Sequence, residues 1–217
     1  MNFKNLKKRI FTSIFLLFLV FLIFNYNIIL VYTLIVIGTL SILEFINLSK
    51  RIFKINFYLY SLNLFFIFYI LIFCLLFYYF LNIIFLKFFI MTFLLGCIAS
   101  DVGGYFFGKI FKGPKLSQYS PNKTISGSIG SFILTSLVIC GILSFLFNKF
   151  DFRMLGIALL TSFFCQFGDL FFSYLKRKAK LKDTSNFLPG HGGILDRIDG
   201  ILFGLPVGFI ALILMYS

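Results

Sequence analysis

Charged side chains are scarce in this sequence. Of its 217 residues, 12 % are charged and 60 % are hydrophobic, and the mean hydropathy is +1.03. Soluble globular domains carry about 25 % charged residues, so the composition excludes a soluble domain and predicts an integral membrane protein. The net charge is +13, because 20 lysines and arginines stand against seven acidic residues. These basic residues lie in short segments between apolar runs, so membrane topology accounts for them and nucleic acid binding is not predicted.

Cysteine and histidine are also rare, with four cysteines and the single histidine His191. Each cysteine lies within an apolar run, and no pair has the C-x-x-C spacing of a metal or redox motif, which favours reduced core residues. Zinc binding at His191 is disfavoured, because no second histidine and no paired cysteine stands near it. Acyl transfer is disfavoured too, since the sequence has no nucleophile elbow and only one histidine to act as a base.

Apolar runs make up most of the chain. A bilayer crossing needs about 20 apolar residues, so we expect an all-α polytopic membrane protein with about seven spans. They are predicted at residues 10–24, 28–47, 57–80, 88–108, 126–147, 153–175 and 200–216. The run over 57–87 would also accommodate a bent helix or a second short span, which gives a range of seven to nine. The first run resembles a signal peptide, but no small-residue cleavage site follows it, and a retained helix is expected.

The basic residues predict the orientation. With the amino terminus in the cytoplasm, 17 of the 20 lysines and arginines lie inside, and only Lys87, Lys149 and Arg153 lie outside. The positive-inside rule therefore favours a cytoplasmic amino terminus and an external carboxyl terminus. Both long polar loops, 109–125 and 176–199, are then cytoplasmic. We divide the chain into N-terminal transmembrane helices, 1–90, and a C-terminal catalytic region, 91–217.

Small residues recur at every fourth position in two of the predicted spans. They are Gly96, Ser100, Gly104 and Gly108 in the fourth, and Gly200, Gly204 and Gly208 in the seventh. This spacing lets helix backbones approach closely and predicts packing seams. Asp101 lies within the first seam, and an acid at this depth is expected to face a partner or a polar cavity. Glu44, near the end of the second span, is expected to pair with Lys50 or Arg51 or to snorkel to the interface.

Charge is concentrated in the stretch from Ser173 to Asp199, which holds six of the 20 lysines and arginines, three of the seven acids and the only histidine. The sixth span leads into it with a polar stripe. Its members, at spacings of 3, 4 and 3 on one helical face, are Gln166, Asp169, Ser173 and Lys176. A carboxylate one to two turns inside the membrane boundary predicts a functional role for Asp169.

Carboxylates interleaved with lysine, arginine and a glycine-rich turn favour phosphate chemistry. Mg²⁺ takes oxygen ligands and bridges carboxylates to phosphates, and cationic side chains neutralise phosphate oxygens. Asp196 and Asp199 would project from one side of the last helix, and Gly192 and Gly193 would form a phosphate nest. In the loop 120–131, an anion site beside Lys123 and an ordinary helix cap by Thr124 or Ser126 both remain open.

The stretch from Ser173 to Asp199 reads S-x-L-K-R-x₄-K-D-x-S-x₂-L-P-x-H-G-G-I-x-D-R-I-D. It resembles the signature of the phosphatidate cytidylyltransferase (CDP-diacylglycerol synthase) family. Three further segments resemble that family's landmarks: D-x-x-G-Y-x-x-G-K from Asp101, S-P-x-K-T from Ser120, and the Gly168–Asp169 pair. Together the matches cover roughly residues 96–205. Family members often carry an aromatic residue and sometimes an acid where this chain has Ile125 and Ser126, and nothing in residues 1–90 is diagnostic.

The resemblance implies an enzyme of the inner cell membrane whose active site faces the cytoplasm. It would join CTP and phosphatidate among the membrane lipids, with Mg²⁺, to give CDP-diacylglycerol and diphosphate, and it leaves a homodimer open. The implied metal ligands are Asp169, Asp196 and Asp199. The implied catalytic residues are Asp169, Asp196, Lys176, His191 and Arg197. The implied substrate-binding residues are Asp101, Lys123, Thr124, Ser126, Ser173, Arg177, Lys182, Asp183, Gly192 and Gly193.

Three other functions would use some of the same residues. A cytidylyltransferase or kinase acting on an isoprenoid lipid would share most of these features, and substrate competition would separate it. A CDP-alcohol phosphotransferase is disfavoured, because no later pair of acids follows Gly200. A small transporter or anion-binding protein with Asp101 and Asp169 on its path is disfavoured by the lack of an inverted hydropathy repeat.

Overall fold

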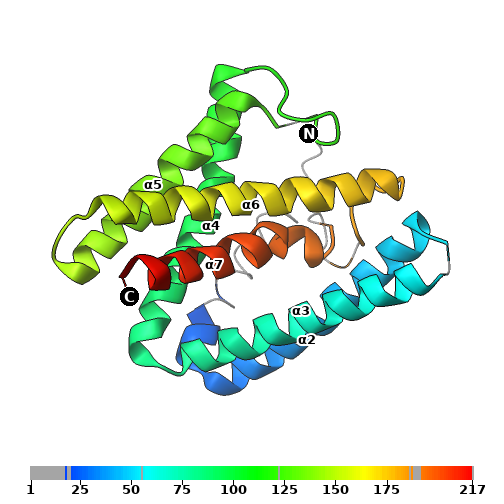
Figure 1. The fold of residues 1–217 in the computed structure, drawn as a ribbon, viewed down its shortest axis with the longest axis horizontal. Coiled ribbons are helices and arrows are strands. Elements are labelled where there is room, and N and C mark those ends of the chain that lie inside the picture. The colour runs from blue at the N-terminus through cyan, green and yellow to red at the C-terminus, as the bar shows by residue number, and fades with distance from the viewer. Residues whose placement is uncertain are drawn as a thin grey trace. The chain divides into compact units, whose positions relative to one another are not determined.

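The computed structural model describes residues 18, 21–54, 56–121, 123–185, 187 and 192–216. Six long helices form within this part of the chain, and their order is shown in Figure 1. They are α2 (Asn27–Ile52), α3 (Phe57–Leu81), α4 (Ile84–Phe111), α5 (Ile125–Phe147), α6 (Phe152–Lys178) and α7 (Leu195–Tyr216). Each is long and apolar enough to cross a membrane. No strand forms among these residues, so the prediction of an all-α, multi-pass membrane protein is confirmed.

Six of the seven predicted spans correspond to α2–α7, while the first, at residues 10–24, lies mostly outside the described residues. The apolar run over 57–87 contains α3 and the start of α4, with a turn at Asn82 and Ile83 between them. Asn82 ends α3, because its side-chain N–H group donates to Tyr78 O (2.8 Å) and its Oδ1 accepts from the Asn27 amide (2.9 Å). A second short span is therefore not formed there.

The chain divides into two compact units that do not follow its linear order. The first contains the described residues up to Ile83 together with Leu175–Arg197, and the second contains Ile84–Tyr174 together with Ile198–Ser217. The helices α6 and α7 each contribute residues to both units. The charged loop after α6 therefore belongs, by its contacts, with the amino-terminal helices. A catalytic region at 91–217 stays a prediction about function.

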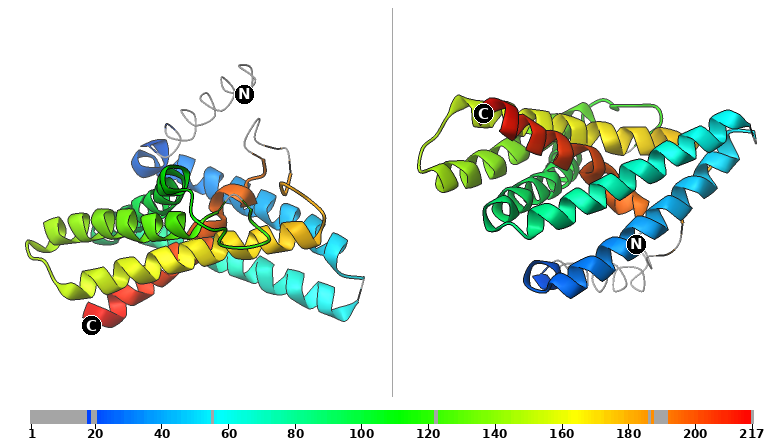
Figure 2. Two further views of the ribbon diagram at one scale, coloured as in Figure 1. Left: turned by 90° about the horizontal axis from the view of Figure 1, so that it is seen from above. Right: turned by 60° about the horizontal axis from the view of Figure 1, so that its bottom comes forward.

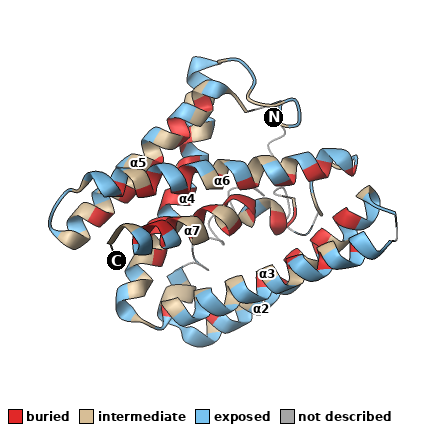
Figure 3. Cartoon of the chain, viewed as in Figure 1, coloured by how far each residue is buried: buried red, intermediate tan, exposed pale blue. Residues whose placement is uncertain are grey.

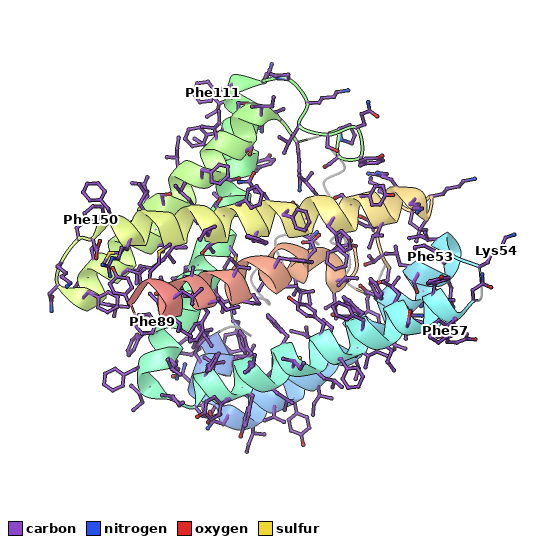
Figure 4. The ribbon with its side chains drawn as sticks, in the orientation of Figure 1. Phe53, Lys54, Phe57, Phe89, Phe111 and Phe150 are labelled. Carbon is purple, nitrogen blue, oxygen red and sulfur yellow. The ribbon has the colours of Figure 1, made fainter. Side chains whose placement is uncertain are left out.

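In the first unit, α2 packs against α3. Phe45 and Phe66 stack with ring centroids 3.8 Å apart, and the buried Ser49 hydroxyl donates to Asn63 Oδ1 at 2.7 Å. Figure 3 shows that α2 and α3 are largely exposed. The exposed large side chains on both helices are apolar, which suits contact with lipid. Phe53, Lys54 and Phe57 lie at the turn between the two helices (Figure 4).

In the second unit, α4 and α5 lie side by side (Figure 2). A Cβ atom added at Gly103 would lie 2.5 Å from Gly130 O, so the two backbones touch. The predicted seam on α4 is confirmed. Its glycines face α5: Gly96 faces Ile139, Gly104 faces Ser131, and Gly108 faces Thr124. The seam on α7 is confirmed as well: Gly200 and Gly204 face Cys165 of α6, and Gly208 faces Thr161.

We predict that Gly103→Ala destabilises the protein by about 1–3 kcal/mol, the usual cost of forcing an extra methyl group into a packed interface. The new methyl group would meet backbone atoms of α5, which cannot turn aside as a side chain could. Thermal unfolding in detergent measures the effect. Gly141→Ala on α5 is the matched control, because a Cβ atom there meets nothing within 4 Å. Equal melting temperatures for the two variants would contradict the close approach of α4 and α5.

Candidate active site

Lys176 and Asp196 form an ion pair in the first unit. Lys176 lies in the last turn of α6 and Asp196 in the first turn of α7, positions where the helix dipoles favour a cation and an anion respectively. The Lys176 Nζ–Asp196 Oδ1 distance is 2.6 Å, and the two side chains are 11 % and 6 % exposed. The other oxygen, Oδ2, accepts hydrogen bonds from Thr184 N (2.8 Å), Thr184 Oγ1 (3.0 Å) and Gly193 N (3.0 Å). The Asp196 carboxylate is thus held on both sides.

The glycines before α7 make this geometry possible. Gly192 has a φ of +84°, in the region that favours glycine. At Gly193 a Cβ atom would lie 2.5 Å from Glu44 Oε2 and would also collide with the Thr184 hydroxyl. The Gly193 N–H group, expected from the sequence to form part of a phosphate nest, donates to Asp196 in this structure. The two glycines therefore admit the carboxylates of Asp196 and Glu44 close to the backbone.

Glu44 has partners that the sequence did not predict. It is 5 % exposed on α2, and its carboxylate contacts the charged loop rather than Lys50 or Arg51. It accepts hydrogen bonds from four donors: Thr184 Oγ1 (2.8 Å), Ser185 Oγ (2.6 Å), Ile194 N (3.0 Å) and Leu195 N (2.8 Å). The expectation of a local ion pair or snorkelling was wrong, because a deeply buried carboxylate needs several donors and the loop provides them. An acid inside an otherwise apolar helix was the available signal.

In the second unit, Lys123 forms an ion pair with Asp169, and each side chain is 29 % exposed. One turn earlier on α6, Gln166 is bonded to the first turn of α5. Ser128 Oγ donates to Gln166 Oε1 at 2.5 Å, and Gln166 Nε2 donates to Ser162 Oγ at 3.2 Å. Two members of the predicted polar stripe therefore face the amino-terminal end of α5 and the lysine that precedes it.

The start of α5 is capped by its own side chains. Thr124 is the N-cap, and its hydroxyl accepts from Gly127 N at 3.1 Å. Ser126 Oγ accepts from Gly113 N at 3.2 Å, which ties the preceding loop to the helix. The capping role proposed for Thr124 is confirmed, and an anion site beside Lys123 stays a prediction.

The other predicted site residues are spread over both units. Asp199 is 8 % exposed in α7, and its Oδ1 accepts from Gly200 N at 2.9 Å, while Gly168 lies against its backbone carbonyl. Ser173 is half-buried on α6. The remaining predicted site residues that the structure describes are exposed: Asp101, Arg177, Lys182, Asp183 and Arg197. His191 lies outside the described residues. Among the residues that are described, no three or more His, Cys, Asp or Glu side chains cluster as a ready metal site.

Two carboxylates that are each paired with a lysine suit phosphate chemistry. Mg²⁺ is commonly held by one or two carboxylates, with substrate phosphates and water completing its coordination. A lysine ammonium is a compact charge on a flexible stem, and it can turn from a carboxylate to a phosphate. Asp169 and Asp196 belong to different units, so their sharing of one metal ion stays a prediction. The fold defines a polytopic membrane protein, and phosphate binding by these pairs stays a prediction.

Comparison with known proteins identifies the family. Residues 60–215 match the model of the Cytidylyltransferase family. Phosphatidate cytidylyltransferase of Staphylococcus aureus (strain COL) is 46 % identical over 116 residues, which are 52 % of this chain and 45 % of the relative. The enzyme of that name from Helicobacter pylori (strain ATCC 700392 / 26695) is 42 % identical over 107 residues, 49 % of this chain and 40 % of the relative. The phosphatidate cytidylyltransferase of Staphylococcus haemolyticus (strain JCSC1435) is 44 % identical over 118 residues, which are 54 % of this chain and 45 % of the relative.

The chain belongs to the cytidylyltransferase family, as the resemblance of its charged stretch had predicted. The matched part spans less than half the length of these curated relatives.

We predict that Lys176→Gln destabilises the protein by about 3–5 kcal/mol, since removing one partner leaves a buried carboxylate uncompensated. Adding Asp196→Asn should recover part of that loss, because the double variant has no unpaired charge. Thermal unfolding of the four proteins in this cycle measures the coupling. Lys178→Gln is the control: this exposed lysine, two residues later, lies over the Phe53 ring, and its loss should change stability little. Additive effects of the two substitutions would show that the pair is not coupled.

Proposed function

We propose that this protein is a phosphatidate cytidylyltransferase, which converts CTP and phosphatidate to CDP-diacylglycerol and diphosphate. The observation that carries the proposal is the family match over residues 60–215, which includes the stretch that holds Asp196 against Lys176. Relatives that are 42–46 % identical over the aligned residues bear this enzyme's name, which supports the substrate assignment. A membrane-embedded chain also suits a substrate whose acyl chains remain in the bilayer.

In the proposed reaction, a phosphate oxygen of phosphatidate attacks the α-phosphorus of CTP. A new P–O bond forms, the bond to the bridging oxygen of the β-phosphate breaks, and diphosphate leaves with that electron pair. The protein's task is to position two polyanions and to neutralise charge on the departing diphosphate. Lys176 and Lys123 are suited to this, because each ammonium lies next to a carboxylate and can turn to a phosphate oxygen.

We propose Mg²⁺ as the cofactor, held by Asp169 and Asp196 with Asp199. The ligand type fits, since Mg²⁺ takes carboxylate oxygens. The geometry at Asp196 fits as well: fixed donors hold Oδ2, while Oδ1 faces a lysine ammonium that a divalent cation could replace. When bound, the ion would supply positive charge to the phosphates of CTP.

The remaining site residues take proposed roles in binding the substrates. The groups proposed to contact phosphates, besides Lys176, are Arg177, Lys182, His191 and Arg197, with Lys123 and Ser126 nearby. The further residues proposed to bind the substrates are Asp101, Thr124, Ser173, Asp183, Gly192 and Gly193. The loops that carry them are proposed to face the cytoplasm, where CTP is found, from the inner cell membrane.

Purified protein in phosphatidate-containing micelles should convert radiolabelled CTP to CDP-diacylglycerol with release of diphosphate. Asp169→Asn and Asp196→Asn should each lower the rate by about 10²–10³-fold, the loss typical of removing one group that stabilises charge in the transition state. Asp151→Asn is the matched control, because this acid lies in the α5–α6 turn and bonds Arg153 N there. Its activity should equal that of the wild type. A wild type that forms no CDP-lipid would refute the proposal.

An isoprenoid phosphate added to the same assay tests the alternative substrate. Under our proposal it neither competes with phosphatidate nor becomes labelled. Labelling of the isoprenoid phosphate in preference to phosphatidate would show that the substrate is an isoprenoid lipid.

The proposed orientation predicts which loops a thiol reagent can reach. In a variant whose four native cysteines are replaced by alanine, Lys182→Cys should be labelled by a membrane-impermeant maleimide only after the cell membrane is opened. Lys149→Cys, in the turn between α5 and α6, should be labelled in intact cells. The reverse pattern would place the charged loop outside the cytoplasm.

A further inference from the structure

The Glu44 carboxylate binds the amino-terminal end of α7 from a helix that precedes it by about 150 residues. Ile194 N–H and Leu195 N–H donate to its two oxygens at 3.0 and 2.8 Å. The first N–H groups of a helix have no partner within the helix and favour a negative charge. Glu44 therefore acts as a capping anion supplied by α2 rather than by the residues next to α7.

The same carboxylate is connected to Asp196 through one side chain. The Thr184 hydroxyl lies 2.8 Å from Glu44 Oε2 and 3.0 Å from Asp196 Oδ2, and it shares its single proton between them. The Thr184 N–H group also donates to Asp196 Oδ2, as does that of Gly193. Two of the three donors to Asp196 Oδ2 belong to Thr184, which also bonds Glu44. The third is Gly193 N, which immediately precedes the two amides that Glu44 caps.

A purely structural clamp could bond the loop anywhere along its length. Here three of the four contacts are with residues that orient Asp196, namely the threonine that binds it and the backbone turn from which it projects, and the fourth is with Ser185 next to that threonine. The other oxygen of Asp196, Oδ1, accepts from Lys176, whose side chain is long and flexible. Carboxylates that bind metal ions are themselves held by hydrogen bonds from surrounding groups, and here Oδ2 is held in this way while Oδ1 faces a cation.

We propose that Glu44 is a positioning residue for Asp196: it holds Thr184 and the first turn of α7 so that Asp196 presents Oδ1 to a divalent cation. This inference rests on the proposed function for its metal, but its effect on local structure can be measured without activity. It assigns a role in the active site to an amino-terminal span in which the sequence showed nothing diagnostic.

The test compares wild type with Glu44→Gln and Glu44→Asp. The glutamine amide fills the same volume, but its NH₂ group must replace one oxygen, and neither Ile194 N–H nor Leu195 N–H can accept a hydrogen bond from it. Aspartate keeps the charge but withdraws it by one methylene group, so it should fold and show intermediate behaviour. Ser41→Ala is the control, because this buried serine lies one turn earlier on α2 and donates to Ile37 O of its own helix.

The first readout is amide hydrogen exchange by NMR on protein in micelles, labelled with ¹⁵N at glycine, isoleucine and leucine. In Glu44→Gln, exchange at Ile194 or Leu195 should be faster by on the order of tenfold or more, and exchange at Gly193 should also rise because Asp196 is displaced. Ser41→Ala should match the wild type. Unchanged exchange at Gly193 would overturn the proposal whatever happens at Ile194 and Leu195, because those two amides bond Glu44 directly whereas Gly193 N bonds Asp196.

The second readout is the Mg²⁺ concentration that gives half-maximal CDP-diacylglycerol formation. It should rise by about 10- to 100-fold in Glu44→Gln, less in Glu44→Asp, and not in Ser41→Ala, as is typical when a group that orients a metal ligand is lost. A merely structural role would reduce the amount of folded enzyme and leave the half-saturating Mg²⁺ concentration unchanged, and that result would also overturn the proposal. If the wild type forms no CDP-lipid, the proposed function fails, while the exchange at Gly193 still decides whether Glu44 positions Asp196.

Discussion

A buried carboxylate must be given hydrogen-bond donors or a cation, and this requirement organises the polar part of the molecule. Glu44 obtains four donors from the charged loop and the start of α7. Asp196 obtains three donors and Lys176. Asp169 obtains Lys123. Because hydroxyls and backbone N–H groups near two of these acids are committed to them, the loop after α6 has little freedom to take another course around Thr184 and Gly193.

Small residues make that arrangement sterically possible. At Gly193, any side chain would collide with the Glu44 carboxylate, and at Gly103, any side chain would collide with the backbone of α5. The two glycines lie in different kinds of contact. Gly103 lets α4 and α5 pack where there is no hydrophobic driving force between apolar helices in lipid, whereas Gly193 exposes an N–H group to a carboxylate. These two glycines therefore serve different contacts, a helix packing contact at Gly103 and a polar contact at Gly193.

The sequence predicted most of the fold and, at the site, a cap at the start of α5, but neither ion pair nor the contacts of Glu44. This division has a physical cause. Apolar runs predict spans because lipid leaves helices as the only way for such a chain to satisfy its backbone. The apolar span was predicted from residue 200, and the expectation that Asp196 and Asp199 lie on the last helix agrees with the start of α7 at Leu195. The contact of Glu44 with this polar first turn was missed, because Glu44 is far away in the chain. A cap by Thr124 was among the alternatives left open, since its partner, Gly127, is three residues away. Partners distant in sequence, as for Glu44, leave no periodic signal.

The ion pair between Lys176 and Asp196 is hard to explain by stability alone. Burying both charges costs desolvation that their attraction often only balances, so well-packed apolar side chains would stabilise the fold as well or better. Apolar side chains could not provide a cation at the end of α6 and an anion at the start of α7. Phosphoryl chemistry needs both, a carboxylate for a metal ion and an ammonium for a phosphate oxygen. Under the proposed function the Glu44 contacts have a purpose, because an ion pair that opens for substrates would need one carboxylate oxygen whose position does not change.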